Sequence, residues 1–135
     1  MFTSGEKDGG EMILSFKTKF PWGTPTNFER KILDGVKIHT IRPDAGARWT
    51  VGRKIHFSTG VRTKSYKQFA SGVVTDIRKV EIHGGVYVDG DVLHSEFDAF
   101  WKNDGFDIED DFWKWFKFDP ETPFVGKLIF WRLDK

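Results

Sequence analysis

The 135-residue chain contains no cysteine. Disulfide bonds, thiolate metal ligands and a cysteine nucleophile are therefore excluded, and the chain suits a reducing compartment. No apolar run approaches the roughly 20 residues that are needed to cross a bilayer. The first residues also lack the apolar core of a signal peptide. We therefore expect a cytoplasmic protein that does not use a membrane as its partner.

Metal-site and phosphate-loop patterns are also missing from the sequence. The four histidines are scattered without paired-ligand spacing, so we expect neither a metal ion nor another cofactor. No Gly-Lys-Ser or Gly-Lys-Thr motif is present to cradle a nucleotide phosphate. The sequence gives no support for nucleotide hydrolysis.

The charges that are present divide unevenly along the chain, although the net charge is only +1. Residues 12–67 hold 12 Lys or Arg against 3 Asp or Glu, whereas residues 68–135 hold 8 against 14. Such a division favours a positive face for an anionic partner. The alternative is that both signs mix over the folded surface.

The periodicity predicts one α+β domain. Residues 1–11 are polar and Gly-rich, and we expect a disordered tail there, which leaves residues 12–135 as the domain. Expected strands cover residues 12–16, 37–42, 53–58, 68–82 and 125–133, with a tight hairpin over 86–93. Because the strands are grouped and the helices segregated, we expect a small sheet that curls into a barrel with short helices at its side.

Three short helices are predicted from capping signals and apolar stripes. The first covers about residues 27–34, with Thr26 and Glu29 at capping-box spacing and Gly35 as a left-handed stop. The second begins after Ser95. The third begins after Asp107, and its predicted buried stripe is Ile108, Phe112, Trp115 and Phe116.

The most informative segment is Gly35-Val36-Lys37-Ile38-His39-Thr40-Ile41-Arg42. It resembles the G-x-K-x-x-T-x-R signature of ASCH domains. Three further segments resemble that family in the expected order, so that the likeness covers about residues 12–133. They are Arg48 to Phe57 with its W-x-x-G pattern, Asn103-Asp104-Gly105-Phe106, and the closing strand Gly126 to Trp131.

The resemblance implies a PUA-like pseudo-barrel with a cleft at Lys37, Thr40 and Arg42, and an RNA or nucleotide ligand. One branch of the family, the small bacterial N4-acetylcytidine amidohydrolases, deacylates a nucleoside with a Lys, a Thr and a Glu. Lys37 and Thr40 match the first two residues. Asp104 matches the third, and its side chain is one methylene shorter than Glu.

The same residues allow two kinds of chemistry. A lysine with its ordinary pKa near 10.4 is a poor base at neutral pH, so Lys37 would need a pKa about 3 units lower to activate Thr40. Burial and Arg42 would lower it, whereas the Asp104 carboxylate would hold the amine protonated as a fixed cation. On a regular strand Lys37 and Thr40 face opposite sides. They can meet only if the strand starts after Lys37 or bulges there.

For binding, Thr40 and Arg42 share one strand face and could clamp an anion. Arg48, Arg53 and Lys54 could follow a phosphate backbone, and Trp49 could stack on a base or fill the core. We therefore expect first an RNA- or nucleoside-binding domain. The second hypothesis is an amidohydrolase of N4-acylated cytidine, with Thr40 as nucleophile, Lys37 as base and Asp104 as acidic partner. The third is a protein-interaction adaptor that uses exposed tryptophans.

Overall fold

The structure is a computed structural model that describes residues 11–44, 46–116 and 121–134. The expected tail, apart from Glu11, lies outside the described residues. The chain runs in the following order: β1 (Glu11–Phe16), α2 (Phe28–Leu33), β2 (His39–Arg42), β3 (Lys54–Thr59), β4 (Lys67–Ile82), β5 (Val86–Val88), β6 (Asp91–Val92), α3 (Phe97–Asn103), α4 (Glu109–Phe116) and β7 (Phe124–Leu133).

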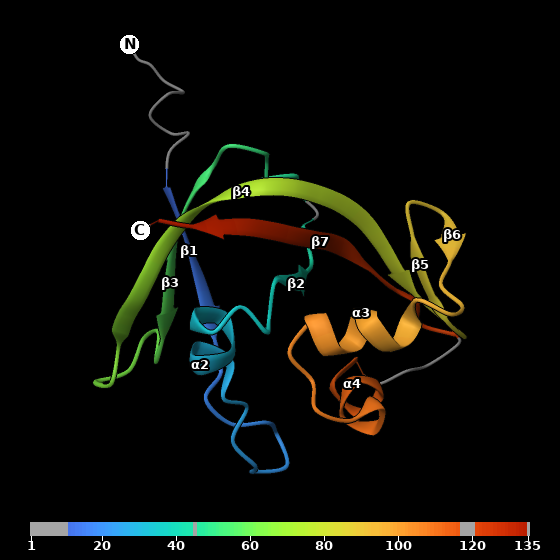
Figure 1. The fold of residues 1–135 in the computed structure, drawn as a ribbon, viewed down its shortest axis with the longest axis horizontal. Helices are drawn as coiled ribbons and strands as arrows, with labels where there is room; N and C mark the ends of the chain where they lie inside the picture. Colours follow the sequence, from blue (N-terminus) through green and yellow to red (C-terminus); the bar gives the residue numbers. More distant parts are fainter. Residues whose placement is uncertain (1–10, 45, 117–120, 135) are drawn as a thin grey trace.

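The strands form one seven-stranded sheet around the long strand β4 (Figure 1). The first half of β4 pairs antiparallel with β3, which pairs parallel with β1. Residues 72–82 of β4 pair antiparallel with β7, which pairs antiparallel with β2. The expected mixture of a sheet with short helices is confirmed. The sheet is open, however, because β1 and β2 are not paired among the described residues, so a closed barrel is not shown.

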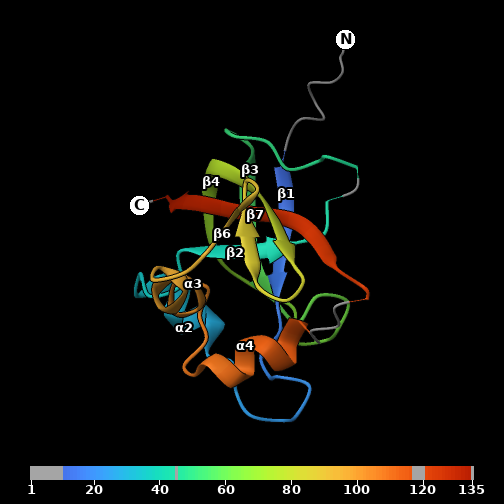
Figure 2. The same ribbon diagram turned by 90° about the vertical axis from the view of Figure 1, so that its right-hand side faces the viewer.

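The helices lie beneath the sheet, on the side toward which β4 and β7 bend (Figures 1 and 2). The core between the layers is strongly aromatic. Phe57 of β3 packs on Phe16 of β1 with ring centroids 6.2 Å apart, and Phe112 of α4 packs edge-on against Phe100 and Phe106. Trp49 is buried, with 8% of its surface exposed. It therefore fills the core, which is one of the two roles that the sequence allowed for it.

Local turn signals were reliable where a glycine supplies the backbone geometry. Gly35 takes φ +79°, and the Val36 amide returns to the carbonyl of Lys31 at 2.8 Å, which ends α2 as predicted. Asp89 and Gly90 both have positive φ, at 52° and 91°, and form the tight turn between β5 and β6.

Two predictions about helix side chains were wrong. The capping box does not form, because Asn27 is the N-cap without a side-chain bond and Glu29 pairs with Lys67 instead. Ile108 is 53% exposed, since it precedes α4 and does not belong to its buried face, whereas Phe112 is fully buried.

Candidate functional site

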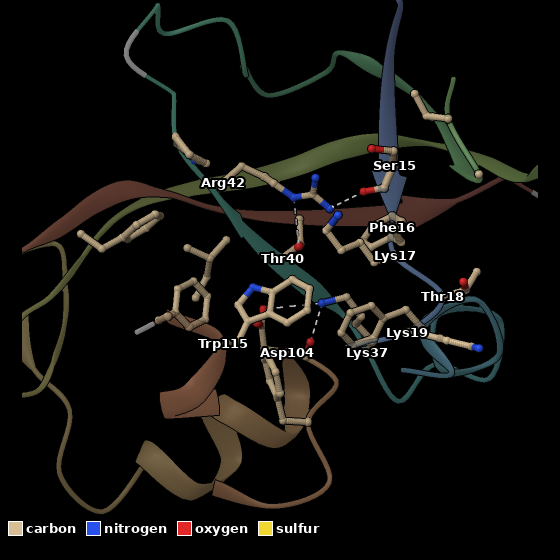
Figure 3. A pocket seen from close by; sticks show the side chains of 18 of the residues that line it. Ser15, Phe16, Lys17, Thr18, Lys19, Lys37, Thr40, Arg42, Asp104 and Trp115 are labelled. Carbon is tan, nitrogen blue, oxygen red and sulfur yellow. Dashed lines mark hydrogen bonds and ion pairs between the residues drawn. The ribbon is translucent and has the colours of Figure 1, made fainter. Parts of the chain in front are cut away.

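A cavity of about 680 Å³ opens where the end of β1, the strand β2 and the helix α4 meet (Figure 3). One part of its lining is charged or polar: Lys17, Thr18, Lys19, Lys37, Thr40, Arg42 and Asp104. The other part is mainly aromatic: Phe16, Phe28, Phe106, Trp115, Phe116 and Phe124. The cavity therefore joins the three residues of the Lys/Thr/Arg segment to Asp104 and to a wall of rings.

Lys37 and Thr40 both line this cavity because Lys37 is not part of a strand. The chain leaves α2 with the Lys37 amide bonded to the carbonyl of Lys31 at 3.0 Å, and β2 begins only at His39. The alternation of side chains along a strand therefore does not apply between positions 37 and 40. The strand thus starts after Lys37, which is one of the two arrangements that would allow Lys37 and Thr40 to meet.

The Lys37 side chain is 2% exposed and sits among polar acceptors and rings. Its Nζ donates to the backbone carbonyls of His39, at 2.9 Å, and of Asp104. It lies 3.8 Å from Asp104 Oδ1 and 4.7 Å from the centre of the Phe28 ring. Burial lowers the pKa of Lys37 from 10.5 to about 8, helped by Arg42 and Lys31 and opposed by the Asp104 carboxylate.

Asp104 is held in place by the turn that ends α3. Gly105 follows it at φ +102°, and a Cβ on Gly105 would lie 2.9 Å from Lys37 Cδ, so the close approach requires glycine. Lys31 of α2 donates to the Gly105 carbonyl at 2.7 Å and pairs with Asp107 at 3.0 Å. These contacts fasten the turn against α2 and fix the carboxylate beside Lys37.

Arg42 connects β2 to β1. One terminal nitrogen of its guanidinium donates to the Ser15 carbonyl at 2.6 Å, and Nε donates to Thr40 Oγ1 at 3.4 Å. The guanidinium carbon also lies 4.9 Å from the centre of the Phe16 ring. Burial lowers the pKa of Arg42 to about 10, against the opposing effect of Asp104. The group is a fixed cation at neutral pH, and it orients the Thr40 hydroxyl.

The other predicted binding residues do not line the cavity. Arg48 and Trp49 donate backbone amides to Asp44, and Lys54 lies 3.7 Å from Asp134. Arg53 directly precedes β3. In this part of the chain the cavity lining begins only after the last residue of β3, at Gly60. Six strand residues span about 20 Å. These four residues therefore lie outside the cavity lining that contains Lys37, Thr40 and Arg42.

Sequence reasoning missed several residues that line the cavity. Lys17 and Lys19 form an exposed basic pair directly after β1. Two lysines at this spacing were the sequence feature that could have indicated a binding role. Trp115 was assigned to the buried stripe of its helix, but it is half-buried and lines the cavity (Figure 3). Its indole packs edge-on against Phe28 with centroids 6.0 Å apart. Trp115 thus offers a ring surface to a ligand.

Across the described residues, no three His, Asp or Glu side chains gather closely enough to hold a metal ion. Within the same ranges, no helix has the length and apolar character needed to span a membrane. No family model, no curated protein and no solved structure matches the chain.

Proposed function

We propose that the chain is an ASCH-type domain of PUA-like fold whose cavity binds a nucleoside or one nucleotide of an RNA strand. Four sequence segments in the family's order support this proposal. The bridge from Arg42 of β2 to the Ser15 carbonyl of β1 also supports it, because it draws together two edge strands of a curled, open sheet.

The observation that carries the proposal is that one cavity contains Lys37, Thr40, Arg42 and Asp104 together with an aromatic wall. Its volume of about 680 Å³ lies within the usual range for small-molecule sites. The half-buried ring of Trp115 can stack on a base, which typically contributes about 1–3 kcal/mol. Lys17 and Lys19 line the same cavity and can attract a phosphate attached to the base-bearing sugar.

Binding is tested by calorimetry with cytidine, its 5′-monophosphate and a short single-stranded RNA at two salt concentrations. We expect measurable binding that weakens with salt for the two phosphorylated ligands. The double variant Lys17→Ala, Lys19→Ala should reduce this salt dependence, whereas the matched variant Lys54→Ala, outside the cavity, should not. Absence of binding to all three ligands would reject the proposal.

A second candidate is the amidohydrolase activity, and the Lys37 amine favours it. A neutral amine has two hydrogens, and the carbonyls of His39 and Asp104 accept two bonds from Nζ, so that a neutral Lys37 would keep its lone pair free. With a pKa of about 8, a substantial fraction of the amine is neutral near that pH. Lys37 could then act as the base that the Thr40 hydroxyl needs.

The proposed reaction converts an N4-acylcytidine and water into cytidine and a carboxylic acid. Thr40 Oγ1 attacks the acyl carbon while Lys37 takes the hydroxyl proton. The C–N bond breaks as Lys37 returns that proton to the departing N4 amine, which leaves an ester on Thr40. Water, deprotonated by Lys37, then cleaves the ester and restores the hydroxyl.

The activity is tested by incubating the protein with a panel of N4-acylated cytidines and following the products by mass spectrometry. We expect turnover that is lost in Lys37→Met and Thr40→Val and retained in Lys54→Met. No turnover with any member of the panel would remove the amidohydrolase candidate and leave the binding proposal standing.

A further inference from the structure

We propose that His39 is a positioning residue that holds the Asp104 carboxylate away from the Lys37 amine, so that Lys37 can lose its proton inside the cavity. This inference rests on the proposed function in taking Lys37 as a group that acts on the ligand. It assigns a role to a histidine that does not itself line the cavity.

One carboxylate oxygen faces both His39 and Lys37, at different distances. Asp104 Oδ1 lies 2.9 Å from His39 Nδ1 and 3.8 Å from Lys37 Nζ. The first distance is that of a hydrogen bond, whereas the second is too long for one. Since a carboxylate only accepts, Nδ1 carries the shared proton. The bond from the imidazole therefore fixes this oxygen at a position beyond hydrogen-bonding distance of the Lys37 amine.

The His39 ring is itself fixed by packing. Its exposure is 3%, and it lies between Phe100 of α3, at 5.2 Å, and Phe130 of β7, at 5.1 Å. Phe130 is also the partner of His39 in the pairing of β2 with β7. The ring thus has few alternative orientations, and its Nδ1 hydrogen remains directed at Asp104.

The orientation of Asp104 matters because it is the acid that faces Lys37 in the described part of the chain. The other charged groups facing the amine are Arg42 of β2 and Lys31 of α2, and both favour the neutral amine. Asp104, at the end of α3, opposes them. If its carboxylate moved from 3.8 Å to hydrogen-bonding distance, the ammonium form would be favoured more strongly. Asp104 already exerts the largest charge effect on the amine, and the bond from His39 keeps its carboxylate from the closer contact that would strengthen this effect.

Two substitutions separate the Nδ1 bond from simple packing. An Asn amide can place a donor near the position of Nδ1, whereas a Gln amide reaches the position of Nε2. His39→Asn should therefore preserve the bond to Asp104, and His39→Gln should lose it while remaining polar and similar in size.

The test is the titration of the Lys37 Cε resonance by NMR in lysine-labelled protein, with the signal assigned by its absence from Lys37→Arg. We expect the Lys37 pKa in His39→Asn to match that of the unmodified chain, and in His39→Gln to rise by about one unit. An unchanged pKa in His39→Gln, or an equal rise in both variants, would overturn the inference.

The titration needs no ligand, so it separates the inference from the proposed function. The expected shift without any nucleoside binding would reject the function and keep the role of His39. Intact nucleoside binding without the shift in the Lys37 pKa would keep the proposed function and reject the role of His39. Should His39→Gln fail to fold, the same titration in Asp104→Glu tests the premise of the inference. The longer carboxylate should reach Lys37 and raise its pKa, and an unchanged or lower pKa would overturn the inference.

Discussion

Lys37 and Asp104 are 67 residues apart in the sequence, yet the Lys37 amine donates to the backbone carbonyl of Asp104 and lies 3.8 Å from its carboxylate. Both side chains are almost completely buried. A buried cation that is bonded mainly to neutral carbonyls is poorly compensated for the water it has lost.

Stability should depend on pH through Lys37. Its native pKa of about 8 lies below the ordinary 10.5, so between these values the unfolded chain binds a proton that the native chain does not. Stability therefore rises with pH in this window, and below pH 8 burial of the charged amine costs about 3 kcal/mol. From pH 7 to 9.5 we expect the free energy of unfolding to rise by about 2 kcal/mol relative to Lys37→Met. Urea denaturation measures it, and parallel pH profiles of the two proteins would contradict it.

Removal of the Asp104 charge should make Lys37 easier to deprotonate. Asp104 is the group that raises the pKa of Lys37, whereas Arg42 and Lys31 lower it. In Asp104→Asn we therefore expect the Lys37 pKa to fall below about 8, by about one unit, in the Cε titration. Asp107→Asn is the matched control, because Asp107 pairs with Lys31 at the surface and should leave Lys37 nearly unchanged. A higher pKa in Asp104→Asn would contradict the prediction.

Gly105 should tolerate alanine much less well than Gly23 does. Both residues have φ near +100°, so alanine is strained in either place, at about 1–2 kcal/mol. Only at Gly105 would the new Cβ meet neighbours, 2.9 Å from Lys37 Cδ and 3.0 Å from Phe28 Cε1. Gly105→Ala should lose about 1–3 kcal/mol more than Gly23→Ala in urea denaturation. Equal losses would mean that the cavity wall yields to the added methyl group.

Ligand affinity should depend on Arg42 and not on Arg48. Arg42 lines the cavity and orients the Thr40 hydroxyl, whereas Arg48 is exposed and outside the cavity. For a phosphorylated ligand we expect Arg42→Met to weaken binding about tenfold or more, because a charge-assisted bond contributes about 1.5–3 kcal/mol. Arg48→Met should change it less than about twofold. Calorimetry at fixed salt compares them, and a larger loss in Arg48→Met would move the binding site to another surface.

Local geometry explains which parts of the fold could be predicted from sequence. The stop at Gly35 and the turn at Asp89-Gly90 depend on positive φ angles, which few residue types adopt readily. The capping box at Thr26 failed because tertiary contacts competed: Glu29 pairs with Lys67, and the Thr26 amide donates to the Thr18 carbonyl at 3.0 Å. Caps of this kind contribute only about 1 kcal/mol, so other contacts easily replace them.

The sequence alone determined the order of strands and helices and the candidate trio Lys37, Thr40 and Arg42, because periodicity and motif spacing are local properties of the chain. Tertiary structure decided which other residues join the trio. It brought Trp115 to the cavity, placed the expected Asp104 beside Lys37, and left Arg48, Arg53 and Lys54 outside the cavity lining. The protonation of Lys37 was also undecidable from sequence, since it depends on burial and on charges contributed by α2, β2 and the end of α3.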